Sequence, residues 1–206
     1  EALSTSVPQI HANAVWNRTA NGYPLRGEGQ TVCVVDGGID YQHPAFANRL
    51  LAGKCYLSSG CPGDENNASD QSGHGTHVAG IVAAKTGDNR GVRGVAPNAR
   101  LYAVKVLNKS GSGSLSQIIS GINWVTKNAK NLGIKVANMS LGFQGTSSTL
   151  DVAIANSIAA GVTYVGGSSL LAVTRTYADD FESVTYSGST GTASWTGPWS
   201  ENPADG

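Results

Sequence analysis

The chain has 206 residues, with 14 Lys plus Arg against 14 Asp plus Glu, so its formal net charge is zero. Without a surplus of basic residues the composition argues against nucleic acid or an anionic membrane as a partner, and no apolar run reaches the roughly 18 residues that span a bilayer. Only 14% of the residues are charged and 27 are glycines, a composition common among exported bacterial enzymes, so we expect a secreted, extracellular protein. The length predicts one domain, with at most a small appendage.

The first predicted strand of the core, residues 31–35, is a continuous apolar run that stops at Asp36. A Val-rich run without alternation is typical of a strand buried on both faces of a parallel sheet. Asp36 then stands at the carboxyl end of the strand, where open α/β sheets place the residues that handle ligands. A turn or helix-capping role ahead of Gly37 and Gly38 is the alternative.

The segment Ser72–Ala84, SGHGTHVAGIVAA, predicts a glycine-rich turn that leads into a helix. Its apolar residues recur at helical spacing, and its small residues let another element approach closely. His74 at the helix start can reach a cleft while its helix stays anchored in the core, which suits a general base. A structural histidine, or a metal site that pairs His74 with His77, are the alternatives.

Predicted strands and helices alternate from the first strand to residue 165. The further strands cover 100–107, 135–141 and 162–165, and the further helices cover 115–130 and 150–160. This β-α-β-α-β-α-β order predicts a doubly wound parallel sheet with helices on both faces, in the α/β class. The predicted strands stop after the fourth, so we expect a truncated version of that fold. A sheet cut there would leave a hydrophobic edge.

The character of the sequence changes at about residue 166. Beyond it, aromatic residues are separated by Ser, Gly and Thr, a pattern typical of β-hairpins. We therefore divide the chain into residues 1–166 and a β-rich tail, residues 167–206. The tail resembles the opening of β-sandwich modules found at the C-termini of secreted bacterial enzymes.

Two of the three cysteines predict a small disulfide. Cys55 and Cys61 lie six apart in a polar loop, which favours a bond between them and an oxidising compartment. Cys33 lies inside the first apolar strand and is expected to be a buried free thiol.

Four segments, VVDGGIDYQHP, SGHGTHVAGIVAA, GVAPNARLYAVKVL and NMSLG, follow one another between residues 31 and 165. Together and in this order they resemble the subtilisin-like serine peptidases, the subtilases. Asp before His is also the order in which subtilisin presents its triad. The resemblance implies a serine endopeptidase acting on extended polypeptides. In it, Asp36 orients the imidazole and stabilises its charged form, while His74 serves as general base and later as general acid.

The same resemblance implies two edges of a peptide-binding cleft. One edge lines the primary specificity pocket, and the other lies opposite, so that an extended peptide would run between two strands. The residues that match these edges are Ser140, Leu141 and Gly142 on one side and Gly111, Ser112 and Gly113 on the other. An ordinary flexible loop is the alternative for the Gly/Ser segment.

The chain departs from the subtilase pattern in its nucleophile. The family's G-T-S-M-A segment is missing, and Gly145-Thr146-Ser147 follows the NMSLG strand too soon to replace it. Ser147 is therefore expected to be a loop residue. The family's A-G-N segment is replaced by Gly166-Gly167-Ser168, which removes an oxyanion donor whose loss typically costs about 2.7–4 kcal/mol. We expect an incomplete catalytic domain with little or no proteolysis by this chain.

The family's structural calcium is also affected. Ala45 stands where the family carries a calcium-binding carboxylate, which leaves Asp88 and Asn89 as candidate ligands, with a polar turn as the alternative. The chemistry itself requires no cofactor. The expected partners are a polypeptide substrate and a propeptide or complementing segment. Two other functions stay open: a non-catalytic peptide-binding pseudo-peptidase, and a fragment that is active only with a second chain that supplies the serine.

Overall fold

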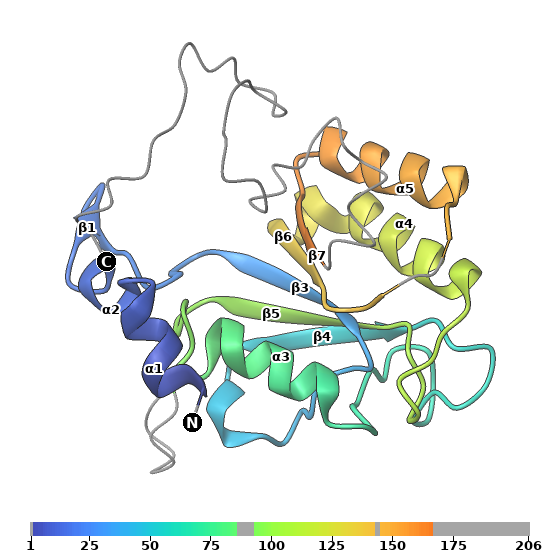
Figure 1. Cartoon of the computed structure of the whole chain (residues 1–206), viewed down its shortest axis with the longest axis horizontal. Helices are drawn as coiled ribbons and strands as arrows, with labels where there is room; N and C mark the ends of the chain where they lie inside the picture. Colours follow the sequence, from blue (N-terminus) through green and yellow to red (C-terminus); the bar gives the residue numbers. More distant parts are fainter. Residues whose placement is uncertain (1, 86–92, 143–144, 167–206) are drawn as a thin grey trace.

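In the computed structural model, residues 2–85, 93–142 and 145–166 are described. They form a five-stranded parallel sheet with helices on both faces, and a separate N-terminal hairpin (Figure 1). The strands of the large sheet are β3 (Thr31–Asp36), β4 (Leu50–Cys55), β5 (Arg100–Lys105), β6 (Ile134–Met139) and β7 (Thr163–Gly166), in the spatial order β4-β5-β3-β6-β7. This architecture confirms the predicted α/β class.

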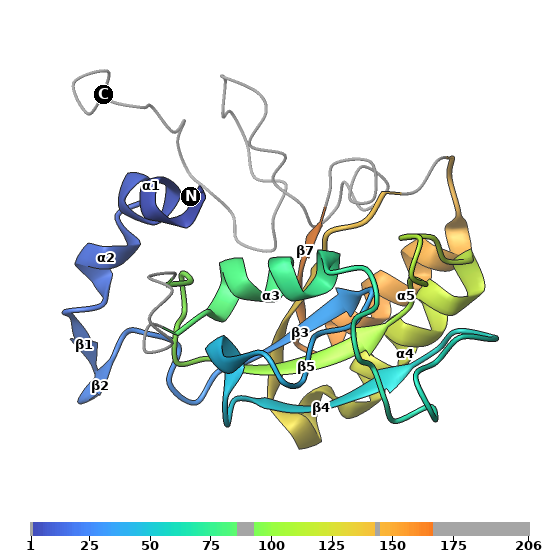
Figure 2. The same ribbon diagram turned by 90° about the horizontal axis from the view of Figure 1, so that it is seen from below.

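The central strand β3 divides the core into two layers. All six of its residues are buried, as expected for a strand covered on both faces. Cys33 and Val35 belong to a core with α4 (Leu115–Leu132) and α5 (Ser148–Ala159). Val32 and Val34 belong to the opposite core with α3 (His74–Ala83). Figure 2 shows α3 apart from the α4–α5 pair.

The termini of α4 follow from its flanking residues. Ser114 accepts a hydrogen bond from the Gln117 N–H, and the Gln117 side chain in turn accepts one from the Ser114 N–H, so both helix-end donors are satisfied. The helix ends before Gly133, whose φ of 64° lies in the left-handed region that glycine adopts without strain. It therefore runs two residues beyond the expected end.

The expected strand order omitted β4, and this part of the prediction is wrong. Within the described ranges β4 is an edge strand that pairs with β5, and most of its residues are partly or fully exposed. Such a strand shows neither a continuous apolar run nor a regular alternation of apolar and polar residues, so its pattern does not predict a strand.

The N-terminal segment holds two short helices and a hairpin. It contains α1 (Ala2–Gln9), α2 (Ala12–Val15) and a hairpin of β1 (Thr19–Ala20) and β2 (Tyr23–Pro24). Asn21 and Gly22 join β1 to β2, and both residues have positive φ. A 3-10 helix, η1 (Pro44–Phe46), follows β3.

Cys55 and Cys61 are joined by a disulfide, and Cys33 is a buried free thiol. No helix within the described ranges is long and apolar enough to cross a membrane. The proposed tail, residues 167–206, lies outside the described residues, so the boundary at residue 166 stays a prediction.

Candidate active site

A buried carboxylate, that of Asp36, lies at the carboxyl end of the central strand. Its side chain is 0% exposed. Its Oδ1 accepts a hydrogen bond from the Gly37 N–H at 2.5 Å, and its backbone carbonyl accepts from the N–H groups of Val106 and Leu107 at 2.8 and 3.2 Å. The strand end is thus fixed to the end of β5 through its backbone, and the carboxylate can accept from a further donor.

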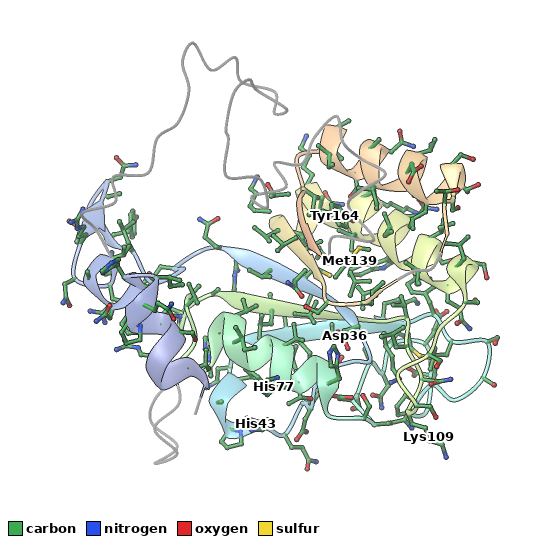
Figure 3. All side chains as sticks on the ribbon, viewed as in Figure 1. Asp36, His43, His77, Lys109, Met139 and Tyr164 are labelled. Atoms are coloured by element: carbon green, nitrogen blue, oxygen red, sulfur yellow. A yellow bond between two sulfur atoms is a disulfide. The ribbon has the colours of Figure 1, made fainter. Side chains whose placement is uncertain are left out.

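That partner is His74, the first residue of α3. Its Nδ1 lies 2.9 Å from Oδ1 and 3.0 Å from Oδ2 of Asp36. Because an ionised carboxylate only accepts, Nδ1 is the donor, and the neutral imidazole keeps Nε2 as its free base. The His74 side chain is 53% exposed while the carboxylate is 0% exposed. A buried acid therefore orients a base that solvent or a substrate can reach. Figure 3 labels Asp36, and it labels His77 on α3.

Asp70 holds the start of α3 in place, and the sequence reasoning did not identify it. Its Oδ1 accepts from the N–H groups of Ser72 and Gly73, and its Oδ2 accepts from the Thr76 N–H and hydroxyl. Burial alone would raise the pKa of Asp70, but these hydrogen bonds outweigh it and lower the pKa. The available signal was an Asp in the turn ahead of the helix, since an Asp side chain accepts from the backbone N–H two residues on.

The glycine after His74 is required by close packing. A Cβ on Gly75 would lie 2.1 Å from the carbonyl oxygen of Gly38 and 3.1 Å from Oδ1 of Asp36. Gly38 itself has a φ of 103°, and a Cβ there would lie 2.2 Å from the Ala68 carbonyl oxygen. The first turn of α3 can therefore approach the Asp36 turn because Gly75 lacks a side chain, and Gly38 makes room for the Ala68 backbone on another side of the turn.

A cleft of about 680 Å³ opens beside His74. The structure brings both expected edges into its wall, together with His74. The lining residues are Ser72, His74, Leu107, Lys109, Ser110, Gly111, Ser112, Gly113, Leu115, Ile118, Ser140, Leu141 and Gly142. Apart from Leu141, the edges consist of glycines and serines. Leu141, Leu107 and Ile118 are the buried apolar residues of the wall.

The Gly/Ser edge is an ordered turn. The Asn108 side chain accepts from the backbone N–H groups of Ser110 and Ser112. The backbone N–H of Asn108 donates to the Ser112 carbonyl. A Cβ on Gly113 would lie 2.1 Å from the Val106 carbonyl oxygen, so this glycine lets the loop pack on the end of β5. These contacts argue against an unstructured linker at this edge.

Ser147 serves as the N-cap of α5. Its Oγ accepts from the Leu150 N–H at 3.3 Å, and it does not line the cleft. His77 follows His74 by one helical turn and is exposed. Within the part of the chain that the structure describes, no group of three His, Cys, Asp or Glu residues is arranged to hold a metal.

The loop around Ala45 does not fit a calcium ion. The Ala45 carbonyl accepts from the Arg49 Nη2 and from the Lys85 N–H. The positively charged guanidinium of Arg49 is buried, and it contacts the carbonyl oxygen that a calcium ion would need. The other calcium candidates, Asp88 and Asn89, lie outside the described residues, as does Ser168.

Comparison with known protein families matches residues 27–171 to the Subtilase family. Subtilisin DY of Bacillus licheniformis is 41% identical over 165 residues, which cover 80% of this chain and 54% of that protein. Subtilisin Savinase of Lederbergia lenta is 42% identical over 168 residues, which cover 82% of this chain and 56% of that protein. An alkaline protease of Alkalihalobacillus alcalophilus is 42% identical over 168 residues, which cover 82% of this chain and 40% of that protein.

The chain thus spans about half the length of the curated relatives it matches. The matched region contains the Asp36–His74 pair, both cleft edges and the whole parallel sheet. By sequence, fold and the paired side chains at the cleft, the chain belongs to the subtilase family.

Proposed function

We propose that this chain carries the acid–base half of a subtilisin-like serine endopeptidase and binds extended polypeptides in the cleft beside His74. The observation that carries the proposal is the contact between His74 Nδ1 and the buried Asp36 carboxylate, at the mouth of a cleft with two backbone edges. The names of relatives, which include an alkaline protease, support the same reaction class.

The cleft suits a polypeptide main chain. The Gly111–Gly113 edge carries little side-chain bulk, so a peptide in extended conformation can add to it as a further strand. The apolar residues between the edges then take up substrate side chains, and Nε2 of His74 faces the peptide bond as general base. Among the described residues that line the cleft, the apolar side chains and the charge of Lys109 contribute to side-chain selectivity.

The nucleophile is the group that this part of the chain does not provide. Among the described residues, the serines that line the cleft with His74 are Ser72, Ser110, Ser112 and Ser140. The Ser72 hydroxyl donates to Oδ1 of Asp70, and the Ser140 hydroxyl donates to Oδ1 of Asn138. Ser147 caps α5. A subtilisin-type acyl transfer therefore needs a serine from polypeptide beyond the described residues.

Two neighbouring surfaces offer a place for such a complementing segment. Across the sheet, Val34, Asn138 and Val165 lie in register on the α3 side, yet Val165 is 49% exposed. On α3 itself, Ile81 is 39% exposed, and no atom of the described part lies within 4 Å of a Cβ at Gly80. A further segment, or a propeptide, that packs between α3 and β7 would cover apolar surface and approach His74.

The test combines binding with turnover. We expect purified chain to bind an unstructured peptide and to leave it intact, because Asp36 and His74 act without a nucleophile. Hydrolysis that a serine-directed inhibitor blocks and Ser147→Ala abolishes would contradict this assignment. An Asp36→Asn variant is the matched control for binding. It keeps the cleft edges and should bind the peptide, although it loses the oriented base.

A non-catalytic peptide-binding role is the second candidate, favoured by intact cleft edges and by Ser147 serving as a helix cap. Mixing the chain with the remaining half of a subtilase distinguishes the two. Turnover on mixing supports a complemented peptidase, while binding without turnover in every mixture supports the pseudo-peptidase. The disulfide at Cys55 and Cys61 suits an extracellular setting for both.

A further inference from the structure

Lys105 is a buried lysine for which neither the acid–base pair nor the cleft accounts. It is the last residue of β5, pairs in register with Asp36 of β3, and is 0% exposed. A lysine is among the residues least often found fully buried, because its ammonium loses hydration unless it is compensated. Its position next to Asp36 therefore calls for a specific explanation.

The lysine ammonium binds the turn that follows Asp36. Lys105 Nζ donates a hydrogen bond to the carbonyl of Gly37. The preceding carbonyl, that of Asp36, accepts from the N–H groups of Val106 and Leu107. The end of β5 thus binds the carbonyls of both Asp36 and Gly37. Backbone N–H groups bind the Asp36 carbonyl, and the Lys105 side chain binds the Gly37 carbonyl.

The turn sets the direction of the catalytic carboxylate. The Gly37 N–H donates to Asp36 Oδ1, the same oxygen that lies 2.9 Å from His74 Nδ1. On the other side, the Gly38 carbonyl packs against the backbone of Gly75 in α3. A rotation of the turn would therefore move Oδ1 and the first turn of α3 relative to each other.

Charges around the ammonium compensate part of its burial. Burial lowers the pKa of Lys105, while the nearby carboxylates of Asp70 and Asp36 oppose that change. A neutral side chain of similar length would avoid the cost of burying a charge. The cation is thus explained by its contact with Gly37 and by the two acids beside it.

We propose that Lys105 is a positioning residue, which fixes the Gly37 carbonyl and so holds the Asp36 carboxylate against His74 Nδ1. The inference rests on the proposed function only in taking this pair as the acid–base unit. It concerns how the pair is held, and it does not depend on whether the cleft binds peptide or where a nucleophile comes from.

The test uses Lys105→Met, which keeps the apolar stem and removes the ammonium. The readout is the far-downfield proton resonance of the His74 Nδ1–H, which reports the hydrogen bond to Asp36. We expect Lys105→Met to lose or strongly shift this resonance while its circular dichroism stays native. Lys135→Met, an exposed lysine on β6 on the other side of β3, is the matched control and keeps the resonance. A folded Lys105→Met chain with an unchanged resonance would overturn the proposal.

A second measurement on the unsubstituted chain covers the case in which Lys105→Met does not fold. A through-hydrogen-bond coupling between the ¹⁵N of Lys105 Nζ and the ¹³C of the Gly37 carbonyl supports the contact, and its absence overturns the proposal. Peptide titration is scored separately. A chain that binds no peptide but loses the His74 resonance in Lys105→Met contradicts the proposed function and leaves the positioning role standing.

Discussion

Two glycines of α3 allow a matched test of how tightly this helix packs against the turn after Asp36. Gly75→Ala and Gly80→Ala make the same chemical change in the same helix, five positions apart. At Gly75 the new Cβ would lie 2.1 Å from the Gly38 carbonyl oxygen. At Gly80 no described atom lies within 4 Å of it.

The two substitutions should change stability in opposite directions. Alanine in place of glycine inside a helix is worth up to about 1 kcal/mol, and at Gly80 nothing described opposes that gain. At Gly75 the helix and the turn would have to separate, and overpacking of this kind costs typically about 1–3 kcal/mol. In a chain of this size each 1 kcal/mol corresponds to about 2–4 °C in the melting temperature.

The assay is thermal unfolding followed by circular dichroism, together with the downfield proton resonance of His74. We expect Gly80→Ala to melt a few degrees above the unsubstituted chain and to keep the resonance. Gly75→Ala should melt below it and shift the resonance, because Asp36 Oδ1 lies 3.1 Å from the new Cβ. A Gly75→Ala chain as stable as Gly80→Ala, with the resonance in place, would refute the packing argument.

Three further outcomes are expected. Ser114→Ala should cost about 1 kcal/mol in urea unfolding through the lost cap of α4, and an unchanged midpoint would contradict the cap. The pKa of Asp70 is lower in the folded chain, so as pH falls the unfolded chain binds a proton at this carboxylate before the folded chain does. The free energy of unfolding should therefore decrease below about pH 4, and it should decrease less steeply in Asp70→Asn. Reducing the disulfide of Cys55 and Cys61 should cost about 2 kcal/mol, measured as the difference between oxidised and reduced melting curves.

The central fold was predictable because its signals are local. The run from residue 31 to 35 is apolar throughout, and β3 is buried on both faces as that pattern implies. The helix after His74 follows from its apolar spacing. β4 was missed because it lies at the edge of the sheet, where exposed and buried positions do not alternate regularly.

The candidate site divides in the same way. Asp36 and His74 lie in motifs that can be read from neighbouring residues, and the structure places them in hydrogen-bond contact. Lys105 stands in an apolar run, and its partner, the Gly37 carbonyl, lies 68 residues earlier. A contact that depends on two strands pairing in register cannot be inferred from either strand alone.

The most direct test of the account follows backbone amide resonances of the ¹⁵N-labelled chain during titration with an unstructured peptide. The account predicts saturable shifts at the two cleft edges, Gly111–Gly113 and Ser140–Gly142, while the peptide stays intact. Shifts confined to other surfaces, no shifts at all, or cleavage of the peptide by the chain alone would contradict it.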